Sequence, residues 1–200
     1  MQTNSQISSH IKVWDPLVRT FHWVLVGAFV VAFITEDDFL TLHVWAGYTI
    51  GAAIAVRLLW GFIGPRHARF TDFVTSPRNA MQYVKDTLLL RARRYIGHNP
   101  AGGLMIVALL ISLTLSVVTG IALYGAEEQA GPMASLFIGS GERWEDALEE
   151  VHEFFSNFTM LLVVIHLAGV LIESLVHKEN LVASMINGFK RTNTNEAERF

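Results

Sequence analysis

The chain has 200 residues, of which 52% are hydrophobic and only 16% are charged, and its mean hydropathy is +0.37. A soluble core of this size needs less apolar sequence, so the composition indicates a membrane protein. The absence of cysteine excludes disulfides, thiolate zinc sites, iron–sulfur clusters and covalent haem attachment, which leaves nitrogen or oxygen ligands for any redox centre. The formal net charge of -3 says little as a sum, whereas the positions of the charges are informative.

Four apolar stretches are long enough to cross a bilayer as helices. They cover residues 16–35, 40–63, 103–124 and 152–176, and each is close to the roughly 20 residues that span a hydrocarbon layer. Asp15 and Pro16 are a typical N-cap and first-turn pair at the start of the first stretch. The eleven residues at the N-terminus are polar, so we expect no cleavable signal peptide there. The predicted fold is all-α, an integral membrane four-helix bundle that forms a single domain over residues 1–200.

A basic linker, residues 64–102, separates the second and third stretches. Ser76 and Pro77 form a helix-start signal, and Met81, Val84 and Leu88 follow at helical spacing among basic residues. Two interpretations stay open, an interfacial helix on anionic lipid or a plain basic connector. A second connector, residues 125–151, is acidic, and residues 142–151 are predicted to continue as helix into the fourth stretch.

The positions of lysine and arginine predict which side of the membrane is cytoplasmic, because these residues are enriched in cytoplasmic segments near span ends. Of the 15 lysine and arginine residues, only Arg143 falls on the side opposite the rest. That opposite side carries two acidic clusters, within residues 36–38 and 127–150. We therefore expect both termini in the cytoplasm and the acidic connector in the periplasm.

Four of the eight histidines, His22, His43, His152 and His166, lie in or at the mouth of apolar stretches. An ionisable side chain inside a membrane is costly and is therefore a functional candidate, although a single histidine can also be a packed polar residue. His152 and His166 are fourteen residues apart, close to four helical turns and about 21 Å, so they share one face at opposite depths. The alternating direction of the spans puts His43 at the external depth of His152, and His22 at the internal depth of His166.

Paired histidines at matched depth are what axial ligation of a haem between helices requires. A zinc site would need three or four ligands at each level. Two imidazoles fill both axial positions of the iron and leave none for oxygen, which favours electron transfer. The sequence therefore predicts two non-covalent b haems whose iron is held by the pairs His22/His166 and His43/His152, with no catalytic residue among them.

Three further residues are weaker candidates for cofactor binding. Arg19 lies one turn before His22, and Arg57 lies near the inner end of the second stretch, so either could neutralise haem propionates. Both could equally be positive residues that reach from a span end to the membrane surface. Gly47 lies one turn after His43, where a missing side chain admits a flat macrocycle or allows ordinary close helix packing.

Several motifs resemble those of the bacterial cytochrome b561 family, over about residues 11–190. They are VWDPLVRTFHW (13–23), HVWAGY (43–48), RLLWGF (57–62) and ARF (68–70), together with His152 and His166. The likeness is strongest to the branch that includes the b-type cytochrome subunits of nickel–iron hydrogenases. The resemblance implies a multi-pass protein of the bacterial inner membrane with two b haems that exchanges electrons with quinone. Family members serve hydrogenases, c-type cytochromes or other reductases, and short members oxidise superoxide while reducing ubiquinone.

We therefore expect a di-haem b-type cytochrome that carries electrons between the quinone pool and a periplasmic redox partner, a c-type cytochrome or a hydrogenase-like protein. Such a protein is an electron carrier or a subunit of a quinone-linked oxidoreductase, with membrane lipid around it and no nucleic-acid partner. The alternatives are a stand-alone superoxide:ubiquinone oxidoreductase and a haem-free membrane anchor or transporter. The acidic external surface would attract a basic cytochrome, or it simply reflects the exclusion of acidic residues from the positive side.

Overall fold

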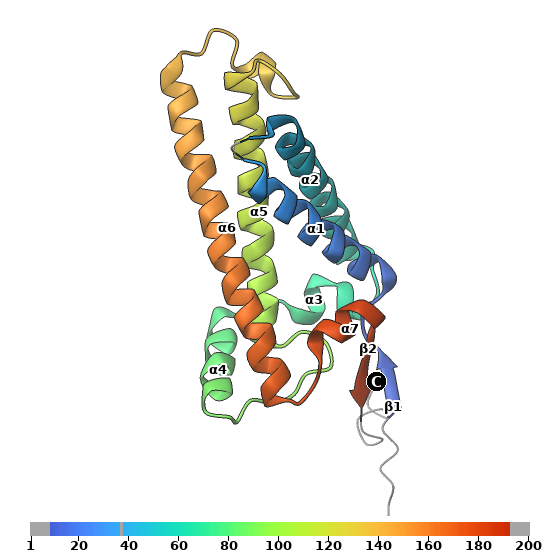
Figure 1. The fold of residues 1–200 in the computed structure, drawn as a ribbon. Coiled ribbons are helices and arrows are strands. Elements are labelled where there is room, and N and C mark those ends of the chain that lie inside the picture. Colours follow the sequence, from blue (N-terminus) through green and yellow to red (C-terminus); the bar gives the residue numbers. More distant parts are fainter. Residues whose placement is uncertain (1–8, 37, 193–200) are drawn as a thin grey trace, which may run out of the picture. The chain divides into compact units, whose positions relative to one another are not determined.

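The computed structural model describes residues 9–36 and 38–192, and these residues are mainly helical (Figure 1). Four helices are long and apolar enough to cross a membrane: α1 (Pro16–Ile34), α2 (Leu40–Ile63), α5 (Pro100–Glu127) and α6 (Glu142–Val176). The predicted all-α membrane bundle is confirmed. Asp37 and Arg199, which contributed to the charge argument, lie outside the described residues.

Local capping explains where these helices begin. The Asp15 carboxylate accepts hydrogen bonds from the backbone N–H groups of Leu17 and Val18, at 2.9 and 3.1 Å, as an N-cap does. Helix α5 begins at residue 100 rather than 103, because the Asn99 side chain accepts from the Gly102 N–H at 2.7 Å and Pro100 suits the first helical position. Helix α6 is continuous from Glu142, as the sequence predicted.

The chain divides into two compact units, which are described separately. The first, here called the bundle unit, contains residues 21–59 and 105–166 and so holds most of the four long helices. The second, here called the mixed unit, contains the remaining described residues: 9–20, 60–104 and 167–192.

Helices α5 and α6 are joined by polar contacts in the interior of the bundle unit. The hydroxyls of Ser112 and Thr159 are 2.6 Å apart, and Thr159, which is completely buried, is also 3.3 Å from the Ser116 hydroxyl. Lipid provides little hydrophobic drive for helices to associate, so small residues and hydroxyl hydrogen bonds at the interface hold them together. Large apolar side chains such as Leu161 and Val164 are exposed instead, as expected for a lipid-facing surface.

The mixed unit contains six short elements besides the ends of the long helices. They are β1 (Ser9–Lys12), the 3-10 turn η1 (Arg66–Ala68), α3 (Phe70–Phe73), α4 (Pro77–Leu88), α7 (Leu181–Asn187) and β2 (Phe189–Thr192). A second 3-10 turn, η2 (Ala134–Leu136), lies in the α5–α6 connector of the bundle unit. The predicted helix start at Ser76 is confirmed, because its side chain accepts from the Asn79 N–H at the beginning of α4.

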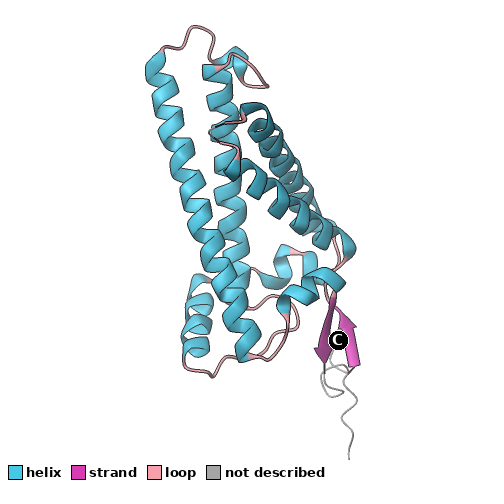
Figure 2. Cartoon of the chain, viewed as in Figure 1, coloured by secondary structure: helices cyan, strands magenta, loops and turns pink. Residues whose placement is uncertain are grey.

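The two ends of the described chain meet in a small antiparallel sheet, coloured magenta in Figure 2. His10 of β1 pairs with Arg191 of β2, and Ile11 pairs with Lys190. Gly188, with φ of 88°, ends α7 in the left-handed conformation that favours glycine, and its carbonyl accepts from the Val13 N–H at 2.9 Å. These contacts fix the segment that precedes α1 against α7.

Candidate functional site

All four intramembrane histidines belong to the bundle unit, and each side chain is half-buried. His22 lies on α1, His43 on α2, and His152 and His166 on α6. On α6 the buried Thr159 lies midway between the two histidines at seven-residue spacing, so all three share one face of the helix. The interior face of this helix therefore presents an imidazole near each end of its apolar segment.

The structure brings the imidazole rings of His43 and His152 close together. Their ring centroids are 6.1 Å apart and their planes are inclined at 88°. A bond from a metal to an imidazole nitrogen is about 2.0–2.1 Å long, so an ion held between two imidazoles separates the ring centroids by roughly 6 Å. The centroid spacing of 6.1 Å would therefore allow these two residues to hold one metal ion between them.

Backbone carbonyls fix the tautomer of both rings. His43 Nδ1 donates to the Ala32 carbonyl of α1 at 2.8 Å. His152 Nδ1 donates to the Ser116 carbonyl of α5 at 3.0 Å and lies 3.2 Å from the Thr119 hydroxyl. Since a carbonyl can only accept, Nδ1 carries the proton in each ring and Nε2 keeps its lone pair for a metal. Such outer contacts orient metal-binding histidines and raise their basicity.

Close approach of α5 to His152 depends on Gly120. A Cβ atom at this position would lie 2.7 Å from Cε1 of the His152 ring and 3.1 Å from Nδ1. Real Cβ atoms essentially never come that close, so any larger residue would displace the ring. Gly120 therefore shapes the space in which the imidazole is held.

His22 and His166 are the second candidate pair. His22 lies on α1 and His166 on α6, and both belong to the bundle unit. The buried Nδ1 of His22 has no hydrogen-bond partner among the described residues. An unsatisfied buried nitrogen is unusual and calls for an explanation, such as a ligand or a polar group that completes the site. This pair therefore has the residues for a second site without the carbonyl support that orients the first.

The weaker candidates differ in their placement. Arg57 is 2% exposed, and its guanidinium lies over the ring of Phe21, next to His22, at 5.8 Å from the ring centroid. A Cβ at Gly47 would have nothing within 4 Å, so there is open space beside α2 one turn after His43. Arg19 belongs to the mixed unit, where it donates to the Ile186 carbonyl of α7.

These observations fit a haem better than a compact metal site. Among residues 9–36 and 38–192, no three His, Cys, Asp or Glu residues gather into a group that could hold a metal ion. The nitrogen donors come in pairs, and open space lies beside one pair at Gly47. A pair of neutral imidazoles is the donor set that a six-coordinate b haem uses.

Four residues around His43 and His152 were not predicted to belong to the candidate site: Ala32, Ser116, Thr119 and Gly120. Two of them act through backbone carbonyls, which any residue provides, so no sequence signal marks them. Gly120 could have been noticed as a glycine at the outer depth expected for His152, but glycine is common in membrane helices.

Comparison with known proteins identifies the family. The family model described as prokaryotic cytochrome b561 matches residues 13–188. The chain belongs to the prokaryotic cytochrome b561 family. It is accordingly a multi-pass protein of the bacterial inner membrane, a b-type haem cytochrome that functions in electron transport.

Curated relatives agree with this family. A probable Ni/Fe-hydrogenase B-type cytochrome subunit of Azotobacter chroococcum mcd 1 is 26% identical over 211 residues, which cover 90% of this chain and 88% of the relative. The protein of the same name from Rhodobacter capsulatus is 25% identical, with coverage of 90% and 81%. A probable Ni/Fe-hydrogenase 1 B-type cytochrome subunit of Escherichia coli K12 is 23% identical, with 94% of each chain covered. No solved structure matches the chain.

Proposed function

We propose that this cytochrome holds two b haems, one between His43 and His152 and one between His22 and His166, and carries electrons across the inner membrane. Its partners are the quinone pool and a periplasmic redox protein, either a hydrogenase or a c-type cytochrome. The observation that carries the proposal is the 6.1 Å centroid spacing of His43 and His152, with both Nδ1 atoms bonded to carbonyls. The printed names of the relatives favour a hydrogenase as the partner.

The orientation that we propose has both termini in the cytoplasm. The lysine and arginine distribution supports it, since only Arg143 departs from the cytoplasmic side. In this orientation His43 and His152 lie near the periplasm, and His22 and His166 lie near the cytoplasm. The two sites would then be stacked across the membrane, about 21 Å apart along α6.

Each residue of the site has a definite task. The Nε2 atoms of the paired histidines would hold the haem iron, and the Ala32 and Ser116 carbonyls keep two of the rings in the tautomer that leaves Nε2 able to bind it. A haem held by these residues would supply one-electron redox chemistry. Gly47 leaves room for the macrocycle next to His43, and Arg57 provides a buried positive charge over the ring of Phe21, which precedes His22. Arg19 would be a partner of a haem propionate, because it lies one turn before His22 in the sequence.

Removing single ligands tests the pairing. The purified holoprotein should contain two haems per chain by pyridine haemochrome assay. His43→Ala and His152→Ala should abolish the same haem, and His22→Ala and His166→Ala should abolish the other, as followed by redox titration of the absorbance band of each haem. His10→Ala, in the exposed strand β1, is the matched control and should keep both haems. Loss of different haems in the His43 and His152 variants would overturn the proposal.

Transmembrane electron transfer needs a second measurement. Holoprotein in vesicles loaded with a membrane-impermeant oxidant should oxidise quinol added to the membrane, and the variants that lack either haem should not. If variants with one haem transferred electrons at the rate of the unsubstituted protein, the two-site conduit would be wrong even though both haems bind.

A further inference from the structure

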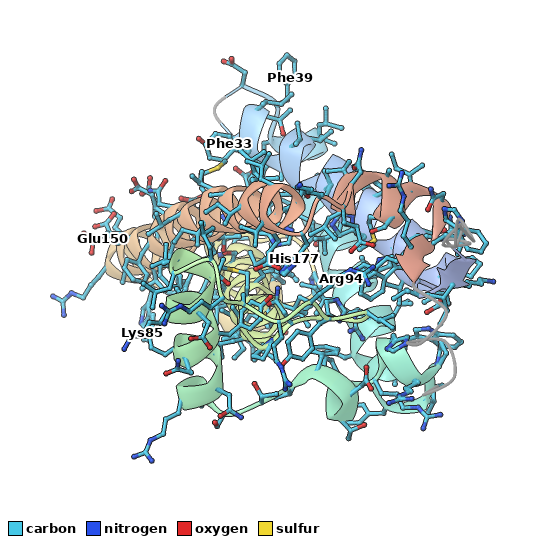
Figure 3. All side chains as sticks on the ribbon, turned by 90° about the horizontal axis from the view of Figure 1, so that it is seen from below. Phe33, Phe39, Lys85, Arg94, Glu150 and His177 are labelled. Carbon is cyan, nitrogen blue, oxygen red and sulfur yellow. The ribbon has the colours of Figure 1, made fainter. Side chains whose placement is uncertain are left out.

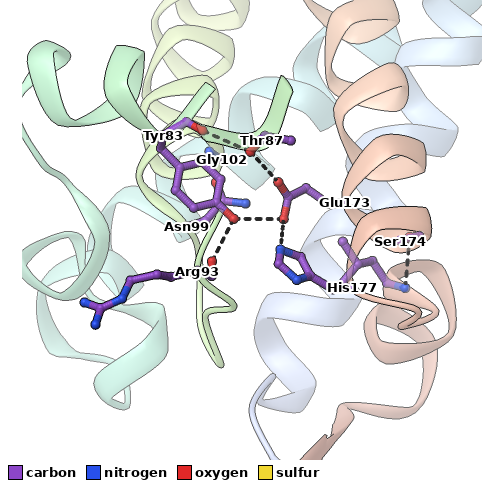
Figure 4. Close-up of polar contacts among 9 residues, drawn as sticks. Tyr83, Thr87, Arg93, Asn99, Gly102, Glu173, Ser174 and His177 are labelled. Carbon is purple, nitrogen blue, oxygen red and sulfur yellow. Dashed lines mark hydrogen bonds and ion pairs between the residues drawn. The ribbon is translucent and has the colours of Figure 1, made fainter. Parts of the chain in front are cut away.

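Helix α4 of the mixed unit has one face packed against protein. Ala80, Tyr83 and Thr87 are buried and lie at helical spacing on this face. The Tyr83 hydroxyl donates to a Glu173 carboxylate oxygen at 3.0 Å, and the Thr87 hydroxyl lies 3.3 Å from the other oxygen (Figure 4). Burial, and then the nearby carboxylate, raise the pKa of Tyr83 well above its usual value, so this hydroxyl stays protonated as a donor. These bonds fix the rotation of α4 relative to the end of α6.

The position of Glu173 gives the depth of α4 in the membrane. Residues 154–172 of α6 contain no Asp, Glu, Lys or Arg, and they are bounded by Glu153 and Glu173. A charge-free helical segment of this length matches the hydrocarbon thickness of a bilayer, so Glu173 marks the boundary between hydrocarbon and headgroups. Because α4 is hydrogen-bonded to Glu173, it lies at this same boundary.

The rest of the α4 surface is strongly amphipathic. Met81 and Leu88 are 71% and 73% exposed, and with Val84 they form an apolar stripe beside the buried face. Arg78 and Lys85 follow on the far edge of the stripe, and Figure 3 shows Lys85 on the outer side of the helix. Gln82, which donates to Asp86 at 2.8 Å, lies beyond them.

We propose that α4 is an in-plane membrane helix, whose apolar stripe of Met81, Val84 and Leu88 enters the bilayer interface while Arg78 and Lys85 bind the phosphates of anionic phospholipids. The order of the three faces around α4 supports an anionic lipid surface as its partner. A helix held at the headgroup level by its protein-facing side has to place its remaining apolar side in lipid, and the adjacent basic side at the phosphate layer. Leu89 and Leu90, both exposed, extend the apolar surface just past the helix.

Spin labels test the depth of the stripe, and the absence of cysteine in the chain makes single-thiol variants simple. Labels on Met81→Cys and Leu88→Cys are compared with a label on Gln82→Cys in holoprotein reconstituted into vesicles of phosphatidylglycerol and phosphatidylcholine. The first two should collide with oxygen, which concentrates in lipid, and the third with a water-soluble nickel chelate. Equal access of the nickel reagent to all three labels would overturn the proposal. Protection of the stripe from both reagents would also overturn it, because a protein surface would then cover it.

The charge on the edge of the stripe is tested separately. A fluorophore on Leu88→Cys should be quenched more by nitroxide-labelled phosphatidylglycerol than by nitroxide-labelled phosphatidylcholine. Replacing Arg78 and Lys85 with glutamine should reduce this preference severalfold, towards equality, while Lys12→Gln, an exposed basic change in β1, should leave it unchanged. Unaltered haem spectra show that each variant is folded. An undiminished preference in the double variant would refute the role of these two residues.

Discussion

Gly120→Ala is the substitution that most directly tests whether His152 is a haem ligand held by packing. The added Cβ would lie 2.7 Å from His152 Cε1, whereas ordinary van der Waals contacts begin at 3.4 Å. The ring would therefore have to move by several tenths of an ångström away from α5. That movement is away from the Ser116 carbonyl, which now accepts from Nδ1 at 3.0 Å.

Loss of an outer-shell contact of this kind typically costs 10- to 100-fold in metal affinity. We therefore expect Gly120→Ala to bind the external haem about 10- to 100-fold more weakly, while the internal haem is retained. The assay is haem content per chain after detergent dilution, combined with redox titration of each haem band. Gly27→Ala, where the new Cβ would meet nothing within 4 Å, is the matched control for the glycine-to-alanine change in a membrane helix. An unchanged content and midpoint potential of the external haem in Gly120→Ala would refute the reasoning.

Three other predictions concern Arg57, Thr159 and Tyr83. Arg57→Gln should lower the midpoint potential of the internal haem by on the order of 50 mV, because a buried positive charge acting through an effective dielectric of about 20 favours the reduced state. Redox titration measures this potential, and a shift confined to the external haem would contradict the prediction. Thr159→Val should lower the free energy of unfolding by about 1 kcal/mol, because Ser112 loses its buried hydroxyl partner at 2.6 Å. The temperature at which both haem absorbance bands are lost measures this change, and Thr49→Val, on the exposed side of α2, is the control. Tyr83→Phe should weaken the contact between α4 and Glu173 by about 1–2 kcal/mol at neutral pH. Because folding raises the pKa of Tyr83, its contribution is complete below about pH 10 and would be lost only as the pH rises through the folded value. Trypsin acts at lower pH, so its cleavage after Arg91 should be faster in the variant than in the unsubstituted protein, by a factor that does not change between neutral and mildly alkaline pH.

The long helices and the histidines within them could be predicted from the sequence, because both appear as local sequence patterns. The stretch predicted at residues 40–63 is α2 to the residue, and the Ser76 and Asp15 caps are present as expected. Depth alone suggested which histidines should face one another, because the direction of each span alternates. The orientation of the His43 and His152 rings could not be predicted from the sequence, since it depends on backbone carbonyls of two other helices.

Features that depend on distant parts of the chain were missed. Strand β1 pairs with β2 across most of the chain length, and the four residues of each strand have no hairpin signal to link them. The short helix α7 does have local signals, since Asn180 caps its start and Gly188 ends it, but its seven residues are too few to show a clear helical periodicity. The interpretation of the basic linker stayed open between an interfacial helix and a connector. The sequence does not show that Tyr83 and Thr87 of α4 contact Glu173 of α6, and this contact identifies the buried side of α4.

The register of α6 ties both candidate sites to one structural requirement. His152, Thr159 and His166 follow one another at intervals of seven residues, and an ideal helix drifts only about 20° over each such interval. Thr159, fully buried against Ser112, fixes the rotation of α6 midway between the two histidines. A single inserted residue between Thr159 and His166 would turn everything beyond it by about 100° and carry His166 off the interior face, while His152 stayed in place. The contact between Thr159 and Ser112 therefore aligns both candidate ligands of α6 at once, although it touches neither of them.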